Sequence, residues 1–293
     1  MKNDKPILNP KIVVVLGVIF VSFSAIFVKL SESPSIIIAF YRMLFTSILL
    51  FPSFIKNGDF GKLKDTKKVL LLILGGVALA FHFYTWFLSI NYTSITSSTL
   101  LVNTQPIFVL IISYIFLKMR YSKKALLGIL VAMLGSVVIS LGDLSGGSNV
   151  IFGDLLAVLA AVCVAIYYSI GAVLRKDMNV VTFTFSAYFV ACIVLMIMAI
   201  GNNLPFTGYS LREYVLFLLL SVVCTILGHN LFSWSLKYVK AEYMSLNILM
   251  EPIYASLWAF MLFGNMPRLN MYIGGAVLLF GIYVFNRNNA EGP

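Results

Sequence analysis

Two pairs of residues, one in each half of the chain, place a polar side chain next to a proline inside an apolar run. Glu251 and Pro252 lie near the middle of the run 241–263, and Gln105 and Pro106 lie in the same place 146 residues earlier, half the length of the 293-residue chain. A carboxyl group in the middle of a membrane costs about 2.5–3.5 kcal/mol, so such a residue is expected to be functional. Each proline removes a backbone donor and loosens the helix at the same depth.

Glu251 has the chemistry to carry a proton or to face a cationic group of a bound molecule. Burial away from water favours the protonated form of a carboxyl group, which brings proton exchange toward physiological pH. The alternative is a structural role, in which the carboxyl group bonds to a neighbouring helix and supports the kink. Gln105 shows that the equivalent position accepts an uncharged amide, so only one half of the chain is expected to exchange protons there.

The two histidines are expected to lie near these residues in depth. His229 lies about seven residues from one end of the run 213–236, and Glu251 lies about eight to ten residues into the next run from the same side, which at 1.5 Å per residue places both roughly 10–15 Å deep. We hypothesise that His229 and Glu251 form a hydrogen-bonded pair on one side of the midplane, and His82 and Gln105 a second pair on the other side, as two gates. The alternative for each histidine is a neutral ring bonded to a backbone carbonyl group.

Further polar residues inside apolar runs are candidates for binding or gating. Arg42 presents a fork of donors that suits a carboxylate or phosphate group. Its alternatives are an approach to the outer headgroups or a bond to Glu32 or Asp154. Polar side chains in spans usually face the bundle interior, and the depth of four others favours Asn103, Asn230, Asn247 and Tyr254. A weaker set comprises Tyr41, Tyr84, Trp86, Tyr167, Tyr168, Trp234 and Trp258.

The segments that hold these residues are apolar enough to cross a membrane. Hydrophobic residues make up 60% of the chain and charged residues 11%, whereas a soluble protein carries about 25% charged residues. The chain is therefore predicted to be an all-α integral membrane protein. Runs of about 20 mostly apolar residues predict ten transmembrane helices, at roughly 12–30, 36–55, 69–90, 95–117, 123–141, 151–174, 181–200, 213–236, 241–263 and 270–286.

Basic residues set the expected orientation and account for the net charge of +10. With the N-terminus in the cytoplasm, 17 of the 21 Lys and Arg residues fall in inside segments, 3 fall outside, and Arg42 lies within a span. This bias predicts that both termini are cytoplasmic, and it removes nucleic acid as an explanation of the charge. Three cysteines, Cys163, Cys192 and Cys224, lie singly in apolar runs, so no disulfide, metal site or cofactor is expected.

The offset of 146 residues recurs along the chain. It pairs Tyr92 with Tyr238, Ser89 with Ser235, Gly128 with Gly274, Gly135 with Gly281 and Lys29 with Arg175. We interpret residues 1–145 and 146–293 as two repeats of five spans each. Because five is odd, the second repeat enters the membrane in the opposite sense, and two inverted halves can alternate access to a site between them. The paired glycines are expected to serve helix packing.

Ten spans in two inverted five-helix repeats, the run FSAIFVKL…AFYRMLF at 23–45 and the Gln-Pro and Glu-Pro helices resemble the drug/metabolite transporter superfamily, most closely its EamA-type metabolite exporters. The resemblance covers nearly the whole chain. It implies a carrier in a bacterial plasma membrane that moves a small molecule, such as an amino acid or another metabolite, through a central cavity. It fixes no substrate.

The function expected from the sequence is secondary transport, with export of a small metabolite across the plasma membrane and proton coupling as an open option. A flippase for an amphiphilic or lipid-linked substrate is the alternative, and a lateral opening between helices would favour it. A membrane enzyme would need a clustered nucleophile, a metal box or paired acids, and the sequence holds no HExxH, no GxSxG and no carboxylate pair. A channel is disfavoured because no filter-like run is present.

Overall fold

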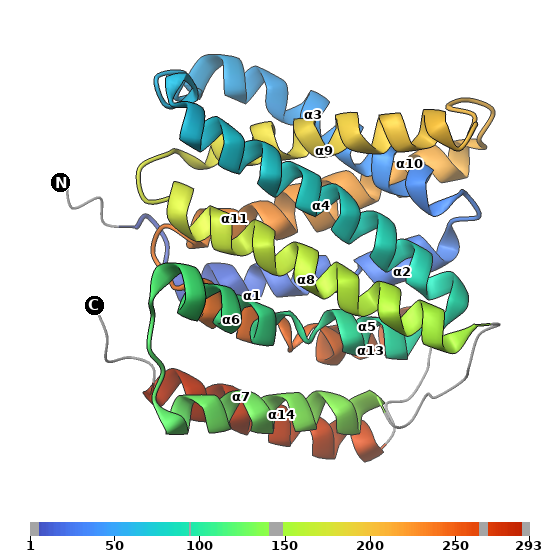
Figure 1. Ribbon diagram of the computed structural model, residues 1–293. Coiled ribbons are helices and arrows are strands. Elements are labelled where there is room, and N and C mark those ends of the chain that lie inside the picture. The colour runs from blue at the N-terminus through green and yellow to red at the C-terminus, as the bar shows by residue number, and fades with distance from the viewer. Residues whose placement is uncertain (1–5, 94, 141–148, 264–268, 289–293) are drawn as a thin grey trace.

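The computed structural model describes residues 6–93, 95–140, 149–263 and 269–288, and within these ranges it contains helices and no strand. Figure 1 shows the helices running roughly alongside one another in a bundle. They are α1 (Pro10–Val21), α2 (Ser24–Leu30), α3 (Ser35–Asn57), the 3₁₀ turn η1 (Lys62–Lys64), α4 (Thr66–Tyr92), α5 (Ile95–Val102), α6 (Gln105–Leu117), α7 (Lys123–Ser140), α8 (Val150–Leu174), α9 (Val180–Gly201), α10 (Leu211–Leu219), the π-helix η2 (Leu220–His229), α11 (Asn230–Ser235), α12 (Ala241–Ile248), α13 (Glu251–Phe263) and α14 (Leu269–Asn288). The prediction of an all-helical protein is confirmed.

Eight helical stretches in the described ranges are long and apolar enough to cross a membrane. They are Pro10–Leu30, Ser35–Asn57, Thr66–Tyr92, Ser97–Leu117, Val150–Leu174, Val180–Gly201, Leu211–Ser235 and Leu269–Asn288. Each matches one expected span. The two other expected spans correspond to α7, which is described as far as Ser140, and to the consecutive helices α12 and α13. The chain is thus a multi-pass membrane protein, and the count of ten spans stays a prediction.

Most of the basic connections gather at one end of the bundle. The carboxylate of Asp177, between α8 and α9, binds Lys62 and Lys68 beside the connection from α3 to α4, at 3.0 and 2.5 Å. Arg175 of the same connection donates a hydrogen bond of 2.9 Å to the carbonyl oxygen of Ser233 in α11. Figure 1 shows the connections from α6 to α7 and from α11 to α12, with the start of α1, at this same end, on the left. Lys and Arg residues tend to collect on one face of a membrane protein, and this end of the bundle is the basic one.

The opposite end is held by an acidic residue. Glu213, in the first turn of α10, accepts hydrogen bonds from the hydroxyl groups of Ser31 and Ser33 and from the backbone N–H of Glu32. These residues connect α2 to α3. Helix α4 therefore begins at the basic end of the bundle, whereas α10 begins at the other end.

Three of the expected spans are broken into two helices. The breaks lie at residues 22–23, 103–104 and 249–250. Pro106 and Pro252 explain two of them, because each is the second residue of the helix that follows, α6 or α13. A proline is well suited to the first turn of a helix but cannot donate to the turn before it.

Helices α7 and α14 pack against each other along their length and lie together at the bottom of the bundle in Figure 1. Their glycines form the contact. A Cβ atom on Gly128 would lie 2.5 Å from the backbone nitrogen of Phe285, and one on Gly135 would lie 2.7 Å from the carbonyl oxygen of Gly274. One on Gly281 would lie 2.7 Å from the carbonyl oxygen of Gly128. The predicted packing role of these glycines is confirmed.

Candidate functional site

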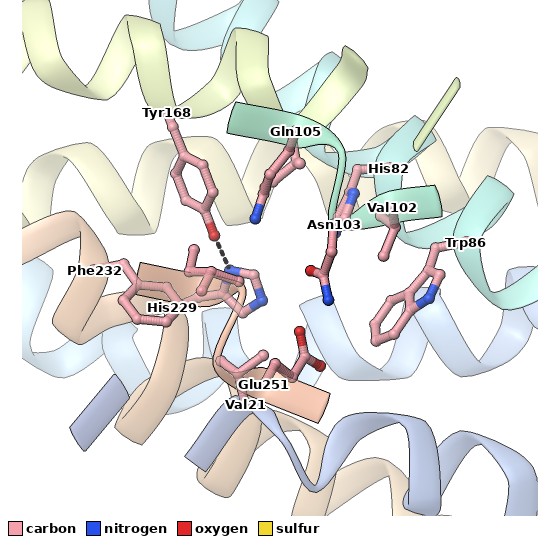
Figure 2. Close-up of a pocket in the computed structure, with 12 residues that line it drawn as sticks. Val21, His82, Trp86, Val102, Asn103, Gln105, Tyr168, His229, Phe232 and Glu251 are labelled. Atoms are coloured by element: carbon pink, nitrogen blue, oxygen red, sulfur yellow. Dashed lines mark hydrogen bonds between the residues drawn. The ribbon is translucent and has the colours of Figure 1, made fainter. Parts of the chain in front are cut away.

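A small cavity lies where the broken helices meet (Figure 2). The side chains that line it are Val21, His82, Trp86, Val102, Asn103, Gln105, Val164, Tyr168, His229, Phe232, Ile248 and Glu251. The cavity has a volume of about 30 Å³, which is room for about two water molecules. A solute the size of an amino acid therefore requires the cavity to widen.

Helix ends beside the breaks supply five of the lining residues. They are the last residues of α1, α5 and α12 and the first residues of α6 and α13, namely Val21, Val102, Ile248, Gln105 and Glu251. Backbone groups at a helix end lack partners within the helix. Inside a membrane, such irregular backbone is tolerated where it is buried in protein or lines a cavity. The arrangement thus places irregular backbone at a site that polar side chains also reach.

Three polar atoms of cavity-lining side chains have no hydrogen-bond partner within the described residues. They are Nε1 of Trp86, Nδ2 of Asn103 and Oε1 of Glu251, which belong to residues only 3%, 2% and 4% exposed. Figure 2 shows the amide group of Asn103 and the carboxyl group of Glu251 facing each other across the space. An unpaired buried polar group costs about 1–3 kcal/mol. A proton, water molecule or polar solute that binds here would remove that cost.

The two histidines make different hydrogen bonds. Nδ1 of His82 donates to the carbonyl oxygen of Ala160 at 3.0 Å, which leaves Nε2 of a neutral ring as an acceptor. Nδ1 of His229 and the hydroxyl group of Tyr168 lie 3.2 Å apart and share a hydrogen bond, drawn as a dashed line in Figure 2. The backbone bond expected as the alternative for a histidine is therefore found at His82.

The structure does not separate the four residues into the two expected pairs. The rings of His82 and His229 lie 6.4 Å apart, and both line the same cavity as Gln105 and Glu251. His229 bonds to Tyr168 and not to Glu251. The depths expected from counting residues assumed unbroken α-helices, whereas these spans contain breaks and, before His229, a π-helix.

Arg42 is fully buried and does not line the cavity. Its Nε donates to Oγ1 of Thr225 at 2.8 Å, and its Nη1 donates to Oγ of Ser24 at 2.9 Å. The expected alternatives of an approach to the headgroups or a bond to Glu32 are therefore wrong, since Glu32 instead pairs with Arg212 at 3.6 Å. Arg42 reaches the cavity only through the residues that it contacts.

Three other candidates lie near the cavity without lining it. Asn247 is buried, but its Nδ2 donates to the carbonyl oxygen of Tyr243 one turn earlier, at 2.6 Å. Asn230 follows His229 directly, and Tyr254 lies one turn after Glu251, and both are partly exposed. In contrast, Trp86 and Tyr168 of the weaker set do line the cavity. Nothing in the sequence distinguished the apolar residues that line the cavity, such as Val21 at the break after α1, from other apolar residues.

The fold and the site together define a class of membrane protein. The bundle consists of apolar helices, and broken helices border a small cavity with both polar and apolar lining, where buried polar atoms have no partner among the described residues. No group of metal-binding residues occurs in the part of the chain that the structure describes. A cavity of this kind suits a carrier of small solutes. The chain belongs to the EamA-like transporter family, which matches residues 10–141 and again residues 151–287.

Relatives agree with this assignment, and a solved structure shares the fold. A protein of Archaeoglobus fulgidus described as an uncharacterized transporter is 30% identical over 94% of this chain and 98% of its own length. A second one from the same organism is 26% identical over 90% and 91%, and the uncharacterized transporter YdfC of Bacillus subtilis is 25% identical over 84% and 79%. A crystal structure of a protein 12% identical in sequence has the same fold, with a TM-score of 0.79 over 95% of this chain and 97% of that one.

Proposed function

We propose that this membrane transporter is a secondary carrier that exports a small metabolite, such as an amino acid or a related organic solute, across a bacterial plasma membrane by alternating access. The observation that carries the proposal is the cavity, where Glu251 and Asn103 present unpaired polar atoms among the ends of broken helices. In alternating-access carriers, sites of this kind lie between two halves near the midplane. Widening of the cavity toward one side, and then toward the other, would admit and release the solute.

Two inverted repeats of five spans, residues 1–145 and 146–293, are the layout we propose for this motion. Three observations support it. The family matches the chain twice, once in each half. Both α6 and α13 begin at the cavity with a polar residue followed by proline, 146 residues apart. Helices α4 and α10, which fall in corresponding parts of the halves, begin at opposite ends of the bundle. With the basic end in the cytoplasm, both termini are cytoplasmic.

Glu251 is the group that we propose exchanges protons during transport. It is the only carboxyl group among the residues that line the cavity, and its Oε1 has no partner among the described residues. A protonated carboxyl group can rest in this site without a counter-ion, whereas the ionised form needs a cationic partner or water. Exchange of the proton therefore responds to what occupies the cavity, which is the requirement for coupling.

The test is flux into proteoliposomes for a panel of amino acids and related metabolites, with and without a pH gradient. The wild type is compared with Glu251→Gln, which keeps the shape and removes the titrating group. Glu242→Gln is the matched control, because Glu242 is a second buried glutamate that does not line the cavity. We expect gradient-dependent flux in the wild type and the control, and its loss in Glu251→Gln.

Two other outcomes would contradict the proposal in different ways. Flux that responds neither to the gradient nor to Glu251→Gln would mean facilitated diffusion and a structural role for Glu251. Absence of flux for every compound, together with movement of a lipid-linked substrate between leaflets, would mean a flippase.

A further inference from the structure

Arg42 is a buried cation that does not line the cavity, so binding at the cavity does not explain why it is there. It lies in the apolar helix α3, is 0% exposed, and forms no ion pair among the described residues. The effective penalty for burying an ion is several kcal/mol, which good hydrogen bonds must offset. Its guanidinium group lies over the ring of Phe83, 4.1 Å from the centroid. The hydroxyl groups of Ser24 and Thr225 accept its hydrogen bonds. The residue is thus held by three other helical elements, α2, α4 and η2.

Both the side chain and the backbone of Arg42 bind the π-helix η2. Thr225 accepts from Nε of Arg42 and donates to the carbonyl oxygen of Leu220, five residues earlier, at 3.0 Å. Ser221, one turn before Thr225, donates to the carbonyl oxygen of Arg42 at 2.9 Å. π-Helical turns are rare and occur frequently at functional sites. Here the unusual turn is held at two points by a single residue of another helix.

The same residue also reaches His229, the last residue of η2. Thr225 precedes His229 by four residues on this helix. On the other side, the ring of Phe83 contacts both the guanidinium group of Arg42 and the ring of His229. The centroids of the Phe83 and His229 rings lie 5.4 Å apart, and the planes of these two rings make an angle of 80°. Any shift of Arg42 therefore acts on His229 by two routes, through the helix η2 that ends with His229 and through the ring of Phe83.

We propose that Arg42 is a positioning residue, whose guanidinium group fixes the π-helix η2 and thereby holds the ring of His229 at the cavity in its bond with Tyr168. The proposal rests on the proposed function only in assigning His229 a part in transport. Arginine suits the task because its planar fork bonds two hydroxyl groups while its face stacks on an aromatic ring. Lysine keeps the charge but lacks that fixed fork, so the two residues are not interchangeable here.

The first readout is the reactivity of Cys224, a fully buried native cysteine within η2, toward N-ethylmaleimide in detergent micelles. Cys163→Ser and Cys192→Ser remove the two other cysteines. In that background, Thr225→Val and Arg42→Lys each remove bonds that hold η2. We expect Cys224 to be labelled about tenfold faster in each variant, because each loses about one hydrogen bond to a charged group. Ser47→Ala is the matched control, because Ser47 is buried in α3 and its hydroxyl group has no partner among the described residues.

The second readout is the ¹⁵N NMR signal of the His229 ring, which His82→Gln isolates because the chain has two histidines. We expect Arg42→Lys and Thr225→Val to shift this signal in the direction given by Tyr168→Phe, which removes the partner of Nδ1. Ser47→Ala should leave it in place.

Unchanged labelling of Cys224 in both Thr225→Val and Arg42→Lys would overturn the proposal. Faster labelling with an unmoved His229 signal would also overturn it, because Arg42 would then hold η2 without positioning the histidine. Neither readout needs transport, so failure of the proposed export would leave this test intact. Glu251→Gln, which tests the transport proposal, is expected to leave the labelling of Cys224 unchanged.

Discussion

Helices α5 and α6 of the first half meet the cavity in the same manner as α12 and α13 of the second half. In each pair a short helix ends, two residues intervene, and a 13-residue helix begins with a polar residue and a proline. The polar residue is Gln105 in one half and Glu251 in the other. The backbone geometry is thus shared, while the group that can titrate is present once.

A second difference lies deeper in the bundle. Arg42 of the first half and Tyr188 of the second are 146 residues apart and both are fully buried. The buried cation Arg42 therefore has an uncharged phenol at the matching position of the second half. In the two-repeat layout that we propose, both halves place a polar residue and a proline at the cavity, whereas the carboxyl group of Glu251 and the guanidinium group of Arg42 have no charged counterpart at the matching position of the other half.

The largest effect is expected from moving the carboxyl group between the halves. Glu251→Gln should lower gradient-driven flux by about 100-fold or more, the usual contribution of a group that transfers protons. Adding Gln105→Glu should recover only a small part of it, because position 105 reaches the cavity from α6 and position 251 from α13, and the amide group of Asn103 faces Glu251. Proteoliposome flux measures both. Wild-type flux in the exchanged variant would mean that the two halves are equivalent at the cavity.

The glycine contact between α7 and α14 tests the part that the halves share. Gly135→Ala and Gly281→Ala place a methyl group against the backbone of the facing helix, and we expect each to destabilise the protein by about 1–3 kcal/mol, as overpacking does. Thermal unfolding in detergent measures the loss. Gly75→Ala is the control, since the nearest atom would lie at an ordinary 3.6 Å. Similar losses at 135 and 281 support the symmetry, and a loss at only one of them would break it.

Burial cost explains why much of the fold and part of the site could be predicted from the sequence. Apolar runs have few stable arrangements other than membrane helices, so eight of the expected spans match described helical stretches. Polar groups such as Glu251, Gln105 and His82 are costly in an apolar run unless they share a polar space, and the structure brings them to one cavity. Proline marks two of the helix breaks directly, through Pro106 and Pro252.

What the sequence did not reveal depends on contacts between distant residues. The stretch LSVVCTILGH contains nothing that distinguishes a π-helix from an α-helix, and its hydroxyl groups meet Arg42 only in the folded chain. The break after Val21 has neither proline nor glycine beside it. Asn247 shows the opposite error, because a buried amide can be satisfied within its own helix and need not face a site.

A smaller effect should separate the two histidines. His229 bonds to a side chain, whereas His82 bonds to a backbone carbonyl group that no substitution removes. We expect Tyr168→Phe and His229→Gln to be non-additive in flux, with a coupling of about 0.5–3 kcal/mol for residues in contact. Tyr168→Phe combined with His82→Gln should be additive. Equal coupling of Tyr168 to both histidines would remove the distinction between the halves at this point.

The smallest effect concerns the two ends of the bundle, where corresponding positions carry different groups. Asp177 binds Lys68 and Lys62, whereas Ser31, 146 residues earlier, binds Glu213. The hydrogen bond from Lys68, and then that from Lys62, holds the pKa of the Asp177 carboxyl group below its usual value.

Because that pKa is depressed in the folded protein, the stabilisation is present above the unfolded value of about 4 and is lost as the pH falls through the lower folded value. The carboxyl group is 45% exposed, so Asp177→Asn should lower the unfolding temperature at pH 7 by only about 1–2 °C, and the difference from wild type should shrink at pH 3. Asp59→Asn, at an acidic residue of the neighbouring connection without an ion pair among the described residues, is the control. A difference that persists undiminished at pH 3 would show that Asp177 stabilises this end by its packing and not by its charge.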